Sequence, residues 1–199
     1  MKKKLQAFYG ISSPWAYLGA QRLYAIAERT GAELELRPIR VIEANGGIPL
    51  RSRPLARQDY HDLELRRWSR YLGIPLNPKP LHYPCRTIEP AAMSVIAVIQ
   101  AGLDARAYSF AVQRALWAED RDIADLDTLH AIARAELGAE QAARFDFGRP
   151  SPEVVAAWDR NLADAEELGI FGTPTYVVDR ELFWGQDRLE FVERALRDA

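Results

Sequence analysis

YGISSPWAY, residues 9–17, decides the fold, because an apolar segment passes here directly into a helical pattern. Ser13 is predicted to be the N-cap of this helix and Pro14 its first residue, since a serine oxygen accepts an unpaired N–H and proline has none. The free N–H groups and aligned peptide dipoles of a helix start favour an anion, whether carboxylate, phosphate or thiolate. By itself a Ser-Pro pair indicates only a capped helix, so the rest of the chain must decide.

The composition is that of a folded globular protein. Of the 199 residues, 48% are hydrophobic and 27% charged, and the net charge is -2. Such a balance gives no general attraction to nucleic acid or to an anionic membrane, and neither is expected as a partner. The single cysteine, Cys85, excludes an internal disulfide and a CxxC pair. Without a signal-peptide core or a membrane-spanning apolar run, a cytoplasmic location is expected.

The N-terminal fifth of the chain has the pattern of a βαβ unit. Strands are predicted over residues 4–9 and 33–39, separated by a helix over residues 14–29 that ends before Gly31. Two strands joined through a helix in this way are expected to be parallel.

Helical periodicity fills the middle of the chain. A helix is predicted over residues 57–72, and a proline-rich passage over residues 75–90 has no assignment. Residues 91–144 read as helical throughout, with three helices as the economical count. The breaks fall at Gly102, at residues 120–122 and at Gly138. Ser151-Pro152 repeats the cap-plus-proline signal and predicts a helix that ends near Gly169.

The chain then returns to strands. Residues 175–178 and 181–184 are predicted strands around a hairpin turn at Asp179-Arg180, and Asp187 is predicted to cap a last helix that runs to Leu196. The complete order, βαβ, helical block and ββα, predicts an α/β protein: a thioredoxin fold with an α-helical insertion.

The predicted domains follow from this order. Residues 1–56 and 170–199 form the thioredoxin-like domain, and residues 57–169 form the insertion, which is expected to pack on it. In thioredoxin-like proteins the turn after the first strand carries the redox pair, and here that position reads Ser13-Pro14-Trp15-Ala16. Without sulfur the turn cannot carry out thiol–disulfide exchange. What remains is a hydroxyl at a helix start, suited to stabilising the thiolate of another molecule.

Thr173-Pro174 opens the third predicted strand after a turn flanked by glycines. In folds of this type the equivalent peptide bond is usually cis, and the N–H and C=O of Thr173 are then free to pair with a ligand.

Three blocks of sequence resemble the 2-hydroxychromene-2-carboxylate isomerase family. This family is similar to the kappa-class glutathione transferases, and both share the DsbA-type arrangement of a thioredoxin fold with a helical insertion. The resemblance covers essentially the whole chain. The blocks are Phe8-Tyr9-x-x-Ser12-Ser13-Pro14-Trp15-x-Tyr17-Leu18, Gly169-Ile170-Phe171-Gly172-Thr173-Pro174-Thr175 and Phe183-Trp184-Gly185-Gln186-Asp187-Arg188-Leu189.

The resemblance implies a glutathione site. It implies that Thr173, in the turn with Pro174, binds the cysteinyl backbone, that Gln186 and Asp187 hold the γ-glutamyl end, and that Asn45 touches the glycine end. From the residues alone, a plain N-cap explains Asp187 equally well. Where the family usually has Asp, two residues after Phe8, this chain has Gly10.

The resemblance also implies catalysis by a bound cofactor. Ser13 would stabilise the glutathione thiolate, which adds to the conjugated, ring-opened form of an aromatic carboxylate substrate, allows a bond to rotate, and leaves. Two alternatives stay open: a kappa-type glutathione transferase or peroxidase, and a non-enzymatic module that binds an extended peptide at Thr173-Pro174. Relatives imply a homodimer.

Several side chains carry weaker signals. Arg51, Arg53 and Arg57 could pair with a substrate carboxylate, although a solvated basic face explains most of that run. Cys85 is interpreted as a small buried residue. The three histidines offer no metal-binding spacing, so no metal is expected. Aromatic residues of the helical block could line a substrate pocket or simply fill the core, namely Tyr60, Trp68, Tyr71, Tyr108, Phe110 and Trp117.

Overall fold

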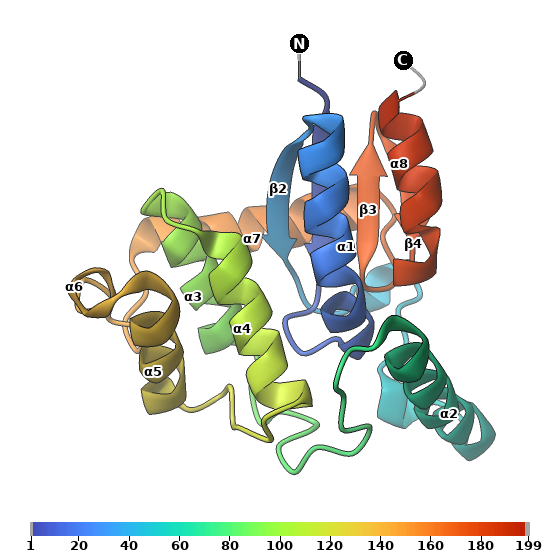
Figure 1. The fold of residues 1–199 in the computed structure, drawn as a ribbon, viewed down its shortest axis with the longest axis horizontal. Coiled ribbons are helices and arrows are strands. Elements are labelled where there is room, and N and C mark those ends of the chain that lie inside the picture. Colours follow the sequence, from blue (N-terminus) through green and yellow to red (C-terminus); the bar gives the residue numbers. More distant parts are fainter. Residues whose placement is uncertain (1, 198–199) are drawn as a thin grey trace.

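Figure 1 shows a computed structural model of the chain, which describes residues 2–197. Its centre is a four-stranded mixed sheet in the order β2-β1-β3-β4. These strands are β1 (Lys4–Tyr9), β2 (Glu33–Pro38), β3 (Thr175–Val178) and β4 (Glu181–Trp184). β1 pairs with β2 in parallel and with β3 antiparallel, and β3 and β4 form the predicted hairpin.

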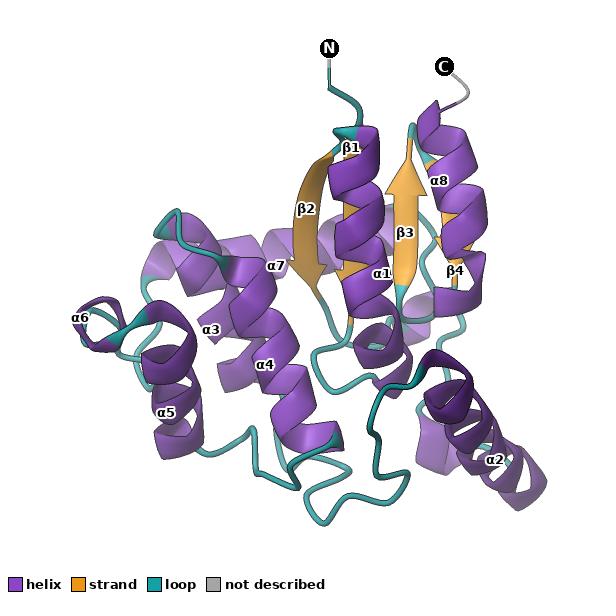
Figure 2. Cartoon of the chain, in the orientation of Figure 1, coloured by secondary structure: helices purple, strands orange, loops and turns teal. Residues whose placement is uncertain are grey.

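Helices cover both faces of this sheet. α1 (Pro14–Thr30) and α8 (Leu189–Arg197) lie on the front face in Figure 2, and α7 (Pro152–Glu167) passes behind the strands. The period-two alternation of β1 places Leu5 and Ala7 in the core under α1 and α8. The next residue, Phe8, points to the opposite face, into a cluster with Ala165 of α7 and other apolar residues. The end of α7, although inside the predicted insertion, therefore packs on the sheet.

The remaining helices form the block that interrupts the thioredoxin fold. They are α2 (Leu55–Leu72), α3 (Glu89–Gln100), α4 (Ala105–Trp117), α5 (Leu126–Leu137) and α6 (Ala139–Ala142). The predicted break at Gly138, where φ is 85°, separates α5 from the single turn α6. In Figure 1, α3 to α6 gather on one side of the sheet, and α2 lies apart from them below the start of α1.

The helical block shares one hydrophobic core with α1, which confirms the expected packing of the insertion. Tyr17 and Leu18 of α1 are buried with Leu116 and other residues of α4. A buried hydrogen bond of 2.7 Å between Tyr9 Oη and Ser109 Oγ joins the end of β1 to α4. The start of α1 is thus fixed from two sides, by the sheet and by the insertion.

The predicted capping role of Asp187 is wrong. A 3₁₀ turn, η3 (Gln186–Arg188), precedes α8, and Asp187 lies inside that turn. Gly185 precedes the turn with φ 103°, a backbone conformation that residues with a side chain rarely adopt. The hairpin turn at Asp179 and Arg180 has φ 49° and 69°, as the twist of a tight hairpin requires.

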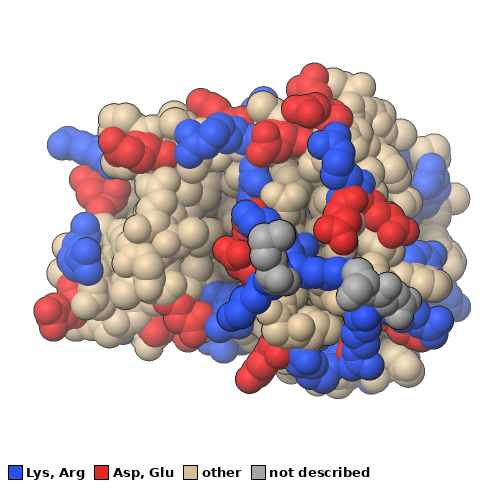
Figure 3. Space-filling view, turned by 90° about the horizontal axis from the view of Figure 1, so that it is seen from above, with Lys and Arg blue, Asp and Glu red and all other residues tan. Residues whose placement is uncertain are grey.

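Charges of both signs are interspersed over the face that carries the two chain ends (Figure 3). Ion pairs join them there, including Arg29 with Glu193 at 2.7 Å and Lys3 with Asp179 at 3.7 Å. Within residues 2–197, the helices lack the combination of length and apolar character that crossing a bilayer requires.

Candidate active site

A cleft of about 540 Å³ lies between the start of α1, the turn before β3, η3 and one face of α2. This volume is in the range of small-molecule sites, roughly 300–1,000 Å³. Four of the residues predicted to bind or activate glutathione line it together: Ser13, Thr173, Gln186 and Asp187. Segments more than 150 residues apart in the sequence therefore meet at one place.

Ser13 has the predicted N-cap geometry. Its backbone is extended, with φ -78° and ψ 121°, and its Oγ accepts the Ala16 N–H at 3.3 Å. The hydroxyl donates to the Thr173 carbonyl at 3.4 Å, at the outer limit for such a bond, so a stronger acceptor can displace it readily. The Trp15 N–H has no acceptor within residues 2–197. A hydroxyl and a helix N-terminus thus face the cleft together.

Thr173 presents unused backbone to the same cleft. The Thr173-Pro174 peptide bond is cis, as expected for this fold. In the described part of the chain the Thr173 N–H has no acceptor. Pro174 itself is buried, and its carbonyl accepts the Gly185 N–H at 2.9 Å. Thr173 is consequently the contact residue of the pair, and Pro174 fixes the turn from behind.

Gln186 and Asp187 enter the cleft from η3. Gln186 is 2% exposed, and its side-chain and backbone carbonyls both accept from Arg22 of α1. Gly19 lets α1 approach this closely, since a Cβ there would lie 2.9 Å from Gln186 Cβ. Asp187 is more open, with 41% of its side chain exposed and Arg188 Nη1 3.4 Å from its carboxylate. The cleft thus has a rigid amide beside an accessible carboxylate.

Asn45 does not line this cleft. Its side-chain amide donates to the carbonyls of Glu166 at 2.9 Å and of Ile170 at 3.1 Å, where α7 ends. The last carbonyls of a helix need such donors. The structure therefore gives Asn45 a capping role at the end of α7, and the implied contact with the glycine end of glutathione stays a prediction.

The structure also shows which of the arginines considered as partners for a substrate carboxylate reach the cleft. Arg53 lines the cleft, but its Nε and Nη2 both donate to the Ile48 carbonyl, at 3.1 and 2.9 Å. Arg51 and Arg57 are not among the lining residues. Arg40 is exposed, lines the cleft, and has no acceptor or ion-pair partner within residues 2–197. The sequence carried one signal for it: Arg40 follows the second strand, whose carboxyl end meets that of β1.

Aromatic side chains form much of the cleft wall. From the sequence alone, Tyr60 and Trp68 could either line a pocket or fill the core. In the structure both, on α2, line the cleft together with Trp15. Trp184 packs edge-on against Phe171 at 4.8 Å between ring centroids. Such walls suit a flat, apolar ring.

Gly172 makes room for the Trp184 indole. A Cβ at position 172 would lie 2.4 Å from Trp184 Nε1. Gly10 likewise makes room for Thr173, although the contact would be less close: a Cβ at position 10 would lie 3.3 Å from Thr173 Oγ1. An aspartate in place of Gly10, as in the family pattern, would crowd the Thr173 hydroxyl.

Two further titratable side chains, His61 and Cys85, differ in their relation to the cleft. His61 lines the cleft, packs edge-on against Trp15 at 5.4 Å, and has a pKa below 6.5 because burial disfavours its charged form. Cys85 is not among the lining residues, and burial raises the pKa of its thiol to about 11. The sequence did not single out His61 for catalysis. Cys85, interpreted from the sequence as a small buried residue, is half-buried in the structure, and its raised pKa disfavours the reactive thiolate.

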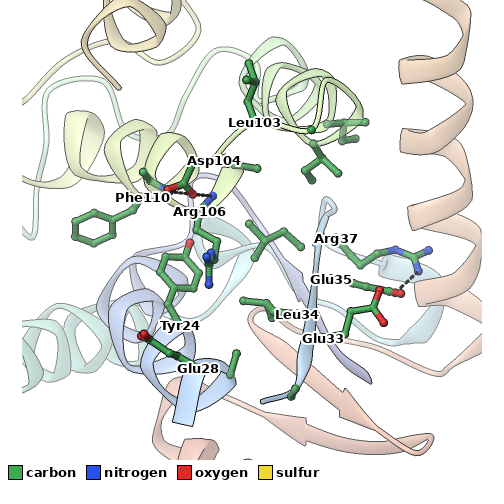
Figure 4. A pocket seen from close by; sticks show the side chains of 18 of the residues that line it. Tyr24, Glu28, Glu33, Leu34, Glu35, Arg37, Leu103, Asp104, Arg106 and Phe110 are labelled. Atoms are coloured by element: carbon green, nitrogen blue, oxygen red, sulfur yellow. Dashed lines mark hydrogen bonds and ion pairs between the residues drawn. The ribbon is translucent and has the colours of Figure 1, made fainter. Parts of the chain in front are cut away.

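A second, larger hollow of about 1530 Å³ lies between the α1–β2 side and α3–α4. Figure 4 shows its labelled side chains, including Tyr24, Glu28 and Phe110. Two of its ionic groups have partners of opposite charge: Glu35 accepts from Gln6 and Lys4, and Arg37 pairs with Asp164. None of the predicted site residues lines this hollow.

Comparison with known proteins identifies the family. A model of the DSBA-like thioredoxin domain matches residues 4–197. The chain belongs to the DSBA-like thioredoxin family. It is 30% identical over 203 residues to a 2-hydroxychromene-2-carboxylate isomerase from Sphingobium xenophagum, with 100% of both chains covered. The resemblance and the fold expected from the sequence are both confirmed.

Solved structures agree with this assignment to the DSBA-like family. A 2-hydroxychromene-2-carboxylate isomerase structure matches with a TM-score of 0.78 and 27% identity, covering 98% of this chain and 94% of the other. The cytosolic disulfide reductase DsbM from Pseudomonas aeruginosa, solved with GSH, matches with a TM-score of 0.68 and 23% identity over 98% of this chain and 99% of its own. At that identity the second match shows a shared fold.

Proposed function

We propose that this protein is a glutathione-dependent isomerase of an aromatic ring-cleavage product, of the 2-hydroxychromene-2-carboxylate type. The relatives similar over their full length carry the name of that activity. The observation that carries the proposal is the placement of the Ser13 hydroxyl at the start of α1, 3.4 Å from the Thr173 carbonyl, in a cleft with aromatic walls.

The polar groups of the cleft fit glutathione. The free N–H of Thr173 can donate to the carbonyl of a bound cysteinyl residue, as peptides are captured by extended backbone. Gln186 and the accessible carboxylate of Asp187 suit the amino-acid end of a γ-glutamyl group. The fold has accommodated this ligand elsewhere, since the related DsbM was solved with GSH.

When bound, glutathione would supply a thiolate that adds to the conjugated form of the substrate and leaves after a bond has rotated. Ser13 and the start of α1 favour the ionised sulfur by a charge-assisted hydrogen bond and by the helix dipole. Ser13 acts by stabilising charge, because the hydroxyl has no base within hydrogen-bond reach in residues 2–197 that could make it a nucleophile.

The second substrate would occupy the aromatic part of the cleft. Trp15, Tyr60 and Trp68 provide flat apolar surface, and the unpaired guanidinium of Arg40 can hold a carboxylate. An anionic aromatic compound therefore fits the same cleft as the thiol.

The direct test is to follow the isomerisation of 2-hydroxychromene-2-carboxylate by absorbance, with and without glutathione. The proposal expects turnover only when glutathione is present, without its consumption. Conjugation of a chlorodinitrobenzene, with loss of free thiol and no isomerisation, would favour the kappa-type transferase. Binding of an extended peptide without binding of glutathione would favour the non-enzymatic alternative.

A further inference from the structure

His61 lies in the wall of the cleft, and its imidazole has no hydrogen-bond partner within residues 2–197. Its side chain is 11% exposed, and Nδ1 is fully buried without a partner within residues 2–197. Nε2 makes no hydrogen bond within residues 2–197 either. Unlike Nδ1, however, it is not fully buried, and it retains access to the cleft. Buried polar atoms are seldom left unpaired, and an unpaired group beside a cleft calls for a functional explanation.

The surroundings of His61 set its tautomer. Nδ1 lies 3.8 Å from Asp62 Oδ1, and the other oxygen of Asp62 is 3.7 Å from Lys79 Nζ. This carboxylate is the anion beside Nδ1, so it favours the proton on Nδ1 and leaves the Nε2 lone pair directed to the cleft.

Other groups around this part of the cleft oppose a charge on the ring. The positive charge of Arg53, in the segment before α2, disfavours protonation of His61. Trp15 packs apolar surface against the His61 ring. Two other titratable residues line the cleft near His61. Glu64, on the same helix, forms an ion pair with Arg67 at 2.6 Å, and Tyr83 lies in the loop after α2. Burial is the largest influence on the pKa of His61 and lowers it, so the ring is neutral near pH 7.

We propose that His61, through Nε2, is the catalytic group that moves the proton of the second substrate when its ring opens or closes. This inference rests on the proposed isomerase function and adds a residue to it. The substrate class is a cyclic hemiketal carboxylate, in which one carbon bears a hydroxyl and the ring oxygen. A neutral imidazole with a free Nε2 can both accept and return a proton at such oxygens.

The proton transfer balances without any further reactant. Nε2 takes the hydroxyl proton, the hydroxyl oxygen forms a C=O double bond, and the bond from that carbon to the ring oxygen breaks. The electron pair of the broken bond goes to the ring oxygen, which becomes a phenolate. The imidazolium then gives its proton to the phenolate, so the enzyme ends as it began. Ring closure is the reverse sequence.

His61→Gln tests this role, with His82→Gln as a matched control outside the lining residues. Glutamine retains hydrogen-bonding capacity but cannot change its charge. The expected result is a loss of about 100-fold or more in kcat/KM for 2-hydroxychromene-2-carboxylate, the usual range for a proton-transfer group. The acid limb of the pH profile, which reports protonation of His61, should disappear, while glutathione affinity measured by calorimetry should stay within about twofold.

A readout independent of turnover is nuclear magnetic resonance of the imidazole nitrogens. The wild-type protein should show His61 as the Nδ1–H tautomer, and its signals should shift on addition of chromone-2-carboxylate, a planar analogue without the hemiketal hydroxyl. A wild type without glutathione-dependent isomerisation would overturn both proposals. An active wild type whose His61→Gln variant retains kcat/KM and the acid limb would overturn the role of His61 alone, as would parallel loss of glutathione binding.

Discussion

Ser13 Oγ lies 3.4 Å from the Thr173 carbonyl oxygen, which joins the start of α1 to the turn before β3 across 160 positions of sequence. The same serine oxygen caps α1. Because this contact is long, and the N–H groups of Thr173 and Trp15 have no acceptor within residues 2–197, the three groups are available to one ligand. A thiol with a peptide backbone matches all three.

Replacing Arg40 tests the placement of the substrate carboxylate. Arg40→Gln should raise the KM for the anionic substrate by about tenfold, since a hydrogen bond to a charged group contributes about 1.5 kcal/mol or more. kcat should change little. Arg57→Gln, an exposed arginine outside the cleft lining, is the control. Equal effects of the two substitutions in steady-state kinetics would show that Arg40 acts only through general charge.

A methyl group at Gly172 should disturb the aromatic wall. Its Cβ would lie 2.4 Å from Trp184 Nε1, so the indole must leave its packing against Phe171. Gly172→Ala is expected to raise the KM for the aromatic substrate roughly 2- to 10-fold, the value of about 0.5–1.5 kcal/mol for an aromatic pair. Gly148→Ala, where the added methyl meets the flexible end of Leu126 at 3.1 Å, should leave the KM unchanged. An unaltered KM in Gly172→Ala would remove Trp184 from the substrate site.

Asp187 can be tested with a modified ligand. Asp187→Asn should weaken glutathione binding about 5- to 10-fold, less than a buried pair would, because 41% of the side chain is exposed. Calorimetry with a glutathione analogue that lacks the γ-glutamyl amino group should show no difference between wild type and variant. Asp179→Asn, in the exposed hairpin turn, is the charge-matched control. If the variant loses affinity for both ligands equally, Asp187 does not hold the ammonium group.

The stability of the protein should report the burial of His61. Burial lowers its folded-state pKa below 6.5, so the unfolded chain binds the proton first as the pH falls. The stability contributed by the neutral ring is present above about pH 6.5 and is lost as the pH falls toward the folded-state pKa. Urea unfolding at pH 7.5 and 5.5 should therefore show a larger loss for wild type than for His61→Gln. Parallel losses would mean that His61 titrates as it does in the unfolded chain.

Local signals predicted most of the fold. The capped helix at Ser13-Pro14, the hairpin at Asp179-Arg180 and the strand bounds of β1, β3 and β4 follow from the chemistry of a few adjacent residues. The cap at Asp187 failed because Gly185 allows a positive φ, and a 3₁₀ turn forms before α8. A cap and a turn interior share the same residue types, so sequence could not separate them.

The meeting of the candidate site residues in one cleft was predictable where a motif carried it. Ser13, Thr173, Gln186 and Asp187 belong to contiguous blocks, and the structure brings them together. Asn45 lies in a loop without such a block, and its amide caps α7. The homodimer and the cytoplasmic location stay predictions.

Two further cleft residues depend on tertiary packing. Arg40 enters the cleft because β2 runs parallel to β1, and His61 because α2 folds over the start of α1. Tyr60, Glu64 and Trp68 of α2 line the cleft and recur every fourth position, so they share one face of the helix. His61 lies next to that face. The periodicity of the sequence identified that face of α2, but it could not distinguish a face packed in the core from one that lines a ligand site.

Proton release on glutathione binding reports directly whether Ser13 stabilises a bound thiolate. Glutathione is titrated calorimetrically near neutral pH, in two buffers of different ionisation enthalpy, into wild type, Ser13→Ala and Ser151→Ala. Ser151 caps α7 next to Pro152, as Ser13 caps α1 next to Pro14, so both variants lose a cap of about 1 kcal/mol. Wild type and Ser151→Ala should release close to one proton, since a free thiol has a pKa of about 8.5, whereas Ser13→Ala should bind with little release. Equal release in all three, or no binding at millimolar glutathione, would contradict the account.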